Sequence, residues 1–178
     1  LRQTEKIIIT STSETYGTAQ TIPIDESHPL VGQSPYSASK ISADQLALSY
    51  HLSFDSPITI ARPFNTYGPR QSSRAIIPTI FSQAILGDTL TLGNLSPTRD
   101  LTYVDDTCKG FLEIANHPDL NGEVINIGSN QEISIGALAE LIKEIVGKDL
   151  IITESQDRLR PEKSEVDRLL ADNRKAKV

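Results

Sequence analysis

Tyr36 and Lys40 are the pair of residues in this sequence whose types and spacing most directly suggest chemistry. They lie in the stretch Ser34–Lys40, at the start of a helical pattern, and residues four apart share one helix face. A phenol titrates near pH ~10 in water, and a nearby cation lowers the pKa of a phenol. Tyr36 beside Lys40 is therefore a candidate acid/base, although ordinary amphipathic helices also show this spacing, with Tyr packed and Lys solvated.

Polar side chains also follow two predicted strands. The β-branched runs at 6–10 and 58–62 indicate strands, and they lead into the loops 11–17 and 63–70. A strand, a long helix and a strand form a right-handed crossover, so we expect the two strands to be parallel and both loops to meet at one sheet edge, where open α/β sheets bind ligands. A polar turn closed by Gly17 is the plainer interpretation of the first loop. The residues expected around this crevice are Thr12, Ser13, Glu14, Tyr36, Lys40 and Asn65.

The helix between these strands should span about Ser34–Phe54. Ser34 is a suitable N-cap, Pro35 suits the first turn, and Ser56-Pro57 would stop the helix. Its apolar residues occupy more than one stripe, which predicts burial on two sides, one against the sheet and one against a partner subunit.

The remaining sequence alternates between helical and strand patterns. The predicted helices are 75–86, 107–116 and 135–146, and the predicted strands are 89–92, 99–104, 123–128 and 150–152. Asp105-Asp106 and Ser134 are the expected helix caps. The final stretch, 154–178, is highly charged and poor in candidate core residues, and it ends without a closing element.

The composition of the sequence argues against several classes of protein. A length of 178 residues with 38% hydrophobic content suffices for one core, and a net charge of −6 provides no basic face for nucleic acid. No apolar run approaches the ~20 residues of a membrane span, and the polar stretch 1–6 does not resemble a secretory leader, so we expect a cytoplasmic protein. The three histidines show no metal-ligand spacing, and the single cysteine, Cys108, is expected to be a small buried residue.

Five motifs occur in an order and spacing typical of one enzyme family. They are Thr12-Ser13-Glu14, Tyr36-x-x-x-Lys40, Arg62 to Pro69, Arg99-Asp100-x-x-Tyr103-Val104-Asp105-Asp106 and Asn126-Ile127-Gly128. Together they resemble the extended short-chain dehydrogenase/reductase family, in particular its nucleotide-sugar epimerases, dehydratases and decarboxylases. The stretches 13–18, 63–71 and 92–100 look most like the NAD-dependent 4,6-dehydratases of nonulosonic (legionaminic-type) acid pathways.

This resemblance implies an α/β fold in two parts. Residues 1–72 would be the C-terminal half of a Rossmann-type NAD-binding domain with a partial parallel sheet. Residues 73–178 would mostly form a small α+β substrate lobe, with segments about 99–128 returning to the sheet. The family binds the cofactor pyrophosphate with a Gly-rich loop that this sequence lacks. We therefore expect an internal or C-terminal piece of a longer chain, which alone would bind NAD poorly and be inactive.

The resemblance also implies roles for individual residues. Tyr36 would remove the proton of the sugar 4-hydroxyl as the C4 hydride passes to NAD⁺, Lys40 would hold the nicotinamide ribose, and Thr12 would bond to the 4-oxygen. Glu14 would remove the C5 proton, and Ser13 or a bound water would relay a proton as water leaves from C6, where the hydride then returns. Ser11 and Pro63 would supply further cofactor contacts.

The implied substrate is a nucleotide-diphosphate sugar, bound mainly by the second half of the chain. The candidate substrate-binding residues are Asn65, Arg70, Leu92, Asn94, Arg99 and Arg160. A guanidinium can bond two phosphate oxygens at once, although an isolated Arg more often forms a surface salt bridge, and Asn65 also suits a turn. The family's usual dimer implies a homodimer through the Ser34–Phe54 helix.

Other functions stay open at this point. A 4-epimerase needs no acid/base at C5 and C6, so Glu14 argues against it, whereas UDP-glucuronate decarboxylases also carry Thr-Ser-Glu. From another class, a non-catalytic binding module could keep the fold, and the missing glycine loop allows this. An enzyme in the parent protein is favoured by the presence of Thr12, Glu14, Tyr36 and Lys40.

Overall fold

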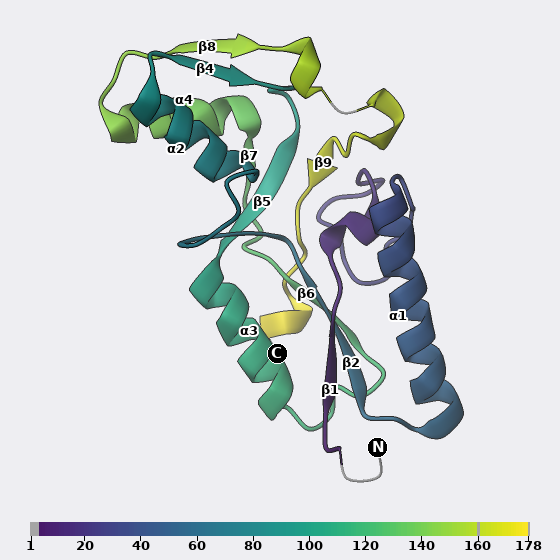
Figure 1. Cartoon of the computed structure of the whole chain (residues 1–178). Helices are drawn as coiled ribbons and strands as arrows, with labels where there is room; N and C mark the ends of the chain where they lie inside the picture. The colour runs from purple at the N-terminus through teal and green to yellow at the C-terminus, as the bar shows by residue number, and fades with distance from the viewer. Residues whose placement is uncertain (1–3, 160, 178) are drawn as a thin grey trace.

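A three-stranded parallel sheet with a helix on each face forms one end of the molecule (Figure 1). The structure, a computed structural model, describes residues 4–159 and 161–177. Strands β1 (Ile7–Thr10), β2 (Ile58–Pro63) and β6 (Val124–Ile127) lie in the order β1–β2–β6, with Ile7 opposite Ile58. The predicted parallel pairing of the first two strands is therefore confirmed.

Helix α1 (Pro35–Phe54) connects β1 to β2 and covers one face of this sheet (Figure 1). Ser34 is its N-cap, as predicted, because its hydroxyl accepts a hydrogen bond from the backbone N–H of Ser37 at 3.1 Å. The described part of the chain buries one side of this helix, and the burial of its other side against a partner subunit stays a prediction. Large apolar residues exposed on α1 include Leu46, Tyr50, Leu52 and Phe54.

A second sheet joins segments that are distant in the sequence. Strand β5 (Thr98–Tyr103) pairs in parallel with β3 (Asn65–Tyr67) and β9 (Arg168–Leu169), and antiparallel with β7 (Glu132–Ser134). Strand β3 lies within the stretch 63–70, which was predicted as loop. Three residues carry no periodicity of their own, so this strand is defined only by its pairing with β5.

Helix α3 (Val104–Asn116) follows β5 directly and covers the other face of the parallel sheet (Figure 1). Because this helix begins at Val104, Asp105 and Asp106 lie in its first turn and are not its caps, which corrects the prediction. Carboxylates in a first turn still favour the helix, since they face the positive end of its dipole. Cys108 is exposed on this helix, so the prediction of a buried cysteine was wrong.

The other end of the molecule is a small helix–sheet unit. Helices α2 (Ile76–Leu86) and α4 (Ile135–Val146) pack against the parallel pair β4 (Thr89–Leu92) and β8 (Ile151–Glu154) (Figure 1). The predicted cap of α4 is confirmed, because Ser134 accepts from the N–H of Ala137 at 3.1 Å. Buried residues shared by these elements include Ile80, Leu90, Leu92, Leu138 and Ile142.

The charged final segment returns to the first half of the chain and contributes to its core. Val166, Leu169 and Ala171 are buried in one cluster with Tyr16, Ile24 and Phe64. The prediction that this stretch is poor in core residues was wrong, because its apolar side chains are few and show no helical period. The division of the chain near residue 72 stays a prediction.

No helix in the described part of the chain is long and apolar enough to cross a membrane.

Candidate active site

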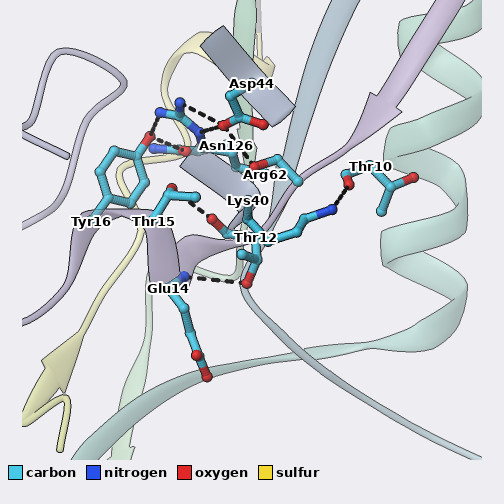
Figure 2. Close-up of polar contacts among 10 residues, drawn as sticks. Thr10, Thr12, Glu14, Thr15, Tyr16, Lys40, Asp44, Arg62 and Asn126 are labelled. Carbon is cyan, nitrogen blue, oxygen red and sulfur yellow. Dashed lines mark hydrogen bonds and ion pairs between the residues drawn. The ribbon is translucent and has the colours of Figure 1, made fainter. Parts of the chain in front are cut away.

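The segment Thr12–Glu14 leaves the carboxyl end of β1 and enters a short 3₁₀ helix, Ser13–Tyr16. The hydroxyl of Thr12 caps this helix by accepting from the N–H of Glu14 at 3.3 Å, and the carbonyl of Thr12 accepts from the Thr15 hydroxyl at 2.8 Å. Ser13 is buried. The carboxylate of Glu14 points away from the buried side chains behind it (Figure 2). This turn therefore presents Glu14 outward from a fixed backbone.

Tyr36 and Lys40 lie one turn apart on α1, as the sequence predicts. The Tyr36 side chain is 53% exposed, so its phenol is open to a ligand. The ammonium of Lys40 donates to the carbonyl of Thr10 at 2.6 Å, which fixes it at the end of β1 (Figure 2). An ammonium has three N–H donors, and others remain for a ligand. Glu14 and Tyr36 line one cavity of about 370 Å³ with Ser34, Ser37 and residues of the final segment.

Asn65 lines a different cavity from Tyr36. This second cavity, of about 450 Å³, is also lined by Leu92, Asn94 and Arg99. Four candidate substrate-binding residues thus lie together, in a cavity of their own. Arg70 is exposed and is not among the described residues that line either cavity, and Arg160 lies outside the described residues.

Arg99 faces the second cavity and is also held by the protein. Its guanidinium donates to the carbonyl of Thr98 at 2.8 Å and to the carboxylate of Glu165 at 3.2 Å. The Arg99 and Glu165 side chains are only 12% and 16% exposed, so this ion pair is more buried than the surface salt bridge considered from the sequence. Arg74 and Arg158 line the same cavity and were missed, because neither lies in a recognisable motif.

Gly93 allows two segments of the wall of this second cavity to pack closely against each other. A side chain at position 93 would place its Cβ 2.6 Å from the carbonyl oxygen of Arg158. Glycine therefore allows the segment that carries Arg158 to lie directly against the Leu92–Asn94 turn.

A buried polar network, which was not predicted from the sequence, lies directly behind Thr12–Glu14. Asp44 of α1 accepts through Oδ2 from Arg62 Nη2 at 2.9 Å, Arg62 Nε at 3.1 Å and the Ser11 hydroxyl at 2.7 Å (Figure 2). Arg62 Nη1 donates to the phenol oxygen of Tyr16 at 3.0 Å, and Tyr16 donates to Asn126 Oδ1 at 2.8 Å. The network thus links the ends of β1, β2 and β6 to α1.

The network also changes the chemistry of Tyr16. Burial raises the pKa of Tyr16 above its ordinary value, and the positive charge of Arg62 opposes this increase. The phenol is therefore a neutral structural donor and is unlike the exposed Tyr36. One signal in the sequence could have indicated this network: Arg62 ends a β-branched strand, and a charge buried there requires a partner.

Comparisons with known proteins place the chain among sugar-nucleotide enzymes. A family model described as GDP-mannose 4,6 dehydratase matches residues 1–178. The chain belongs to this family. Its relatives include the low-salt glycan biosynthesis protein Agl12 of Haloferax volcanii, 38% identical over 80% of this chain and 46% of the relative. UDP-glucuronic acid decarboxylase 6 of Arabidopsis thaliana is 36% identical over 83% of this chain and 45% of the relative.

Solved structures of related enzymes share the fold. The dTDP-glucose 4,6-dehydratase of Bacillus anthracis, solved in complex with NAD, superposes with a TM-score of 0.85 at 32% identity, covering 97% of this chain and 54% of that one. The UDP-glucuronic acid 4-epimerase of Bacillus cereus, solved with UDP-glucuronic acid and NAD, gives 0.88 at 33% identity, with coverage of 97% and 54%. The expected Rossmann-type α/β fold and NAD-dependent family are confirmed. The chain spans about half the length of the relatives that it matches.

The residues present fit one end of NAD. The exposed phenol of Tyr36 and the fixed ammonium of Lys40 are suitable partners for ribose hydroxyls. Of the other two predicted cofactor contacts, Ser11 is buried with its hydroxyl bonded to Asp44, and Pro63 is half-buried at the end of β2. No Gly-rich phosphate-binding loop occurs in this sequence, so these residues would hold only the nicotinamide side of the dinucleotide.

Proposed function

We propose that this chain carries the catalytic residues of an NAD-dependent nucleotide-sugar 4,6-dehydratase. The observation that supports this reaction is the placement of Glu14 and Tyr36 on one cavity. Dehydration needs a base at C5 in addition to the base that serves the 4-hydroxyl. A carboxylate and a phenol on the same cavity meet that need.

Each residue has a stated part in this proposal. Tyr36 acts as a phenolate, which the positive charge of the Lys40 ammonium stabilises, and it becomes a neutral phenol when it takes the proton of the sugar 4-hydroxyl. Thr12 donates its hydroxyl hydrogen to the 4-oxygen, since its oxygen already accepts from Glu14 N–H. NAD, when bound, supplies the hydride acceptor and later the hydride donor. Glu14 then removes the C5 proton, which the neighbouring C4 ketone makes acidic. Ser13 or a bound water relays a proton as water leaves from C6, to which the hydride returns.

The second cavity suits the nucleotide diphosphate of such a substrate. The guanidiniums of Arg74, Arg99 and Arg158 outnumber the single carboxylate, that of Glu165, among the described lining residues. Guanidiniums bond phosphate oxygens in pairs, and Asn65 and Asn94 supply amide groups beside them. We place the diphosphate there, with the sugar extending toward Tyr36.

A product assay distinguishes this proposal from the other reactions of the family. The full-length protein would be incubated with NAD and nucleotide-linked glucose, N-acetylglucosamine, mannose and glucuronic acid, and each product would be weighed by mass spectrometry. Loss of one water is the expected result. Loss of carbon dioxide would indicate a decarboxylase, an unchanged mass with an inverted C4 would indicate a 4-epimerase, and no reaction would favour a binding module.

We also propose that the full-length protein forms a homodimer through α1. The side of this helix that faces away from the sheet carries Leu52 and Phe54, which are 83% and 72% exposed. Burying such residues against a second copy would remove apolar surface from water. Analytical ultracentrifugation should detect a dimer that Leu52→Glu weakens, and a monomer in the wild-type protein would contradict this arrangement.

A further inference from the structure

One buried ion pair fixes both ends of the segment Thr12–Glu14. At the start of the segment, the Ser11 hydroxyl donates to Asp44 at 2.7 Å. At its end, the phenol oxygen of Tyr16 accepts from Arg62 at 3.0 Å. Asp44 and Arg62 are joined to each other at 2.9 and 3.1 Å. The two ends of the segment are therefore connected through a single pair of side chains.

The same helix stripe carries Tyr36, Lys40 and Asp44. These residues are four apart, so they lie on one face of α1 at successive turns. The Lys40 ammonium donates to the carbonyl of Thr10 (Figure 2). One turn further along, Asp44 accepts from the Ser11 hydroxyl. The face of α1 that presents Tyr36 to the cavity is thus also hydrogen-bonded to the end of β1.

Solvent reaches neither member of this ion pair. Asp44 is 0% exposed and Arg62 is 2% exposed, so water cannot replace a lost bond. All the hydrogen bonds of Asp44 go to one oxygen, Oδ2, and Oδ1 has no partner among the described residues. The guanidinium of Arg62 also lies over the ring of Tyr16, 4.9 Å from its centre. A change in either charged residue would remove the side-chain anchor at one end of the segment and leave the anchor at the other end without its ion-pair partner.

We propose that Asp44 and Arg62 are positioning residues that set Thr12 and Glu14 relative to Tyr36. Both side chains are buried behind the segment, and neither lines the cavity that Glu14 and Tyr36 share. Their effect on catalysis therefore passes through the placement of Thr12 and Glu14. The expected effect of these two residues on kcat rests on the proposed function.

The double variant Asp44→Leu/Arg62→Met separates positioning from stability. Replacing both charges by apolar residues of similar size is often neutral or stabilising, so this variant should melt close to the wild-type temperature. It nevertheless loses the bonds to Ser11 and Tyr16. Since a misplacement of ~1 Å can cost about 100-fold in rate, kcat should fall about 100-fold, while the KM for the nucleotide sugar changes less than about threefold. A wild-type kcat in a stable double variant would overturn the proposal.

Two further variants keep the test decisive if the double variant does not fold. Tyr16→Phe retains the ring and removes one anchor, and a single anchoring hydrogen bond of ordinary strength predicts a kcat about fivefold lower at unchanged KM. Ile142→Ala is the control, because Ile142 lies in the core between α2 and α4, away from the network. It should lower the melting temperature without lowering kcat. A loss of kcat in proportion to melting temperature across all variants would instead show a purely structural role.

Amide hydrogen exchange tests positioning without any turnover. In the double variant, peptides covering 11–16 should exchange faster than in the wild type, and in Ile142→Ala they should not. If the wild-type protein converts no nucleotide sugar, the proposed function fails. Hydrogen exchange alone then decides whether Asp44 and Arg62 position the segment. Faster exchange at 11–16 then supports the positioning role, and unchanged exchange overturns it.

Discussion

Asp44 and Asp100 are both completely buried, but their carboxylates are stabilised in different ways. Asp44 in the first half is paired with a cation, Arg62, through one oxygen. Asp100 in the second half accepts from neutral donors through both oxygens: the N–H and hydroxyl of Ser129 at 2.8 and 2.6 Å, the N–H of Asn130 at 2.9 Å and the N–H of Ala171 at 3.1 Å. A buried carboxylate can thus be stabilised by one charge or by several amides.

The difference follows what each carboxylate connects. Asp100 joins β5 to the loop at 129–130 and to the final segment, so its bonds close the fold. Asp44 joins α1 to the segment that carries Thr12 and Glu14, so its bonds set the candidate active site. The ion pair holds Asp44 through one partner side chain, Arg62. Asp100 is held mainly by hydrogen bonds from the backbone N–H groups of several residues.

Removal of the Asp44 carboxylate should have the largest effect on stability. Asp44→Ala leaves the guanidinium of Arg62 buried without its ion-pair partner, and breaking one side of a buried pair costs about 3–5 kcal/mol. Urea unfolding followed by circular dichroism measures this loss. Asp106→Ala is a matched control, because it breaks an ion pair to Lys109 whose side chains are 62% and 72% exposed, and should cost less than about 1 kcal/mol.

Asp100→Asn should have a smaller effect on stability. The amide keeps the size of the side chain and one acceptor oxygen, but its NH₂ group faces backbone N–H donors, so we expect a loss of about 1–3 kcal/mol. The loss should appear as faster hydrogen exchange at 129–131 and 168–172. If this variant proves less stable than Asp44→Ala, the contrast between the two carboxylates is wrong.

The smallest expected effect concerns an ion pair near the surface that also holds the final segment. The Arg168 guanidinium donates to Glu132 and lowers the pKa of Glu132 below its ordinary value. A carboxyl group with a lowered folded-state pKa stabilises the fold above its unfolded-state pKa, and this contribution disappears as the pH falls through the folded-state value. Glu132→Gln should therefore be less stable than the wild type at pH 7, and the gap should close on acidification.

Thermal melts of both proteins between neutral and acidic pH measure this gap. Some acid sensitivity should persist in Glu132→Gln, because the pKa of Asp25 and the pKa of Asp172 are also lowered by hydrogen bonds. A constant difference between the two proteins at all pH values would show that the Glu132–Arg168 pair contributes no pH-dependent stability.

Local patterns predicted the frame of the candidate site. Ser34 and Pro35 marked the start of α1, and the β-branched runs on either side of it identified the parallel strands. Tyr36 and Lys40 followed from helical spacing, and Glu14 from its place after a strand. These signals lie within a few residues of one another, which is why a sequence displays them.

Contacts between distant residues could not be predicted in the same way. Asp44 and Arg62 are 18 residues apart, and Arg99 and Glu165 are 66 apart. Nothing in the charged final segment indicated that Val166 and Leu169 pack against Tyr16, because that contact depends on the return path of the chain. Cys108 faces outward for a similar reason, since the orientation of α3 is set by the sheet on which it packs.

We propose Tyr36 as the acid/base of a nucleotide-sugar 4,6-dehydratase, and one variant tests this role directly. Tyr36→Phe in the full-length protein removes only the phenol oxygen, so kcat should fall by about 10²–10⁴-fold while calorimetry shows nearly unchanged binding of the nucleotide sugar. Tyr50→Phe, on the same helix and outside the cavity, is the matched control and should retain wild-type turnover. Near-normal turnover in Tyr36→Phe would contradict the account.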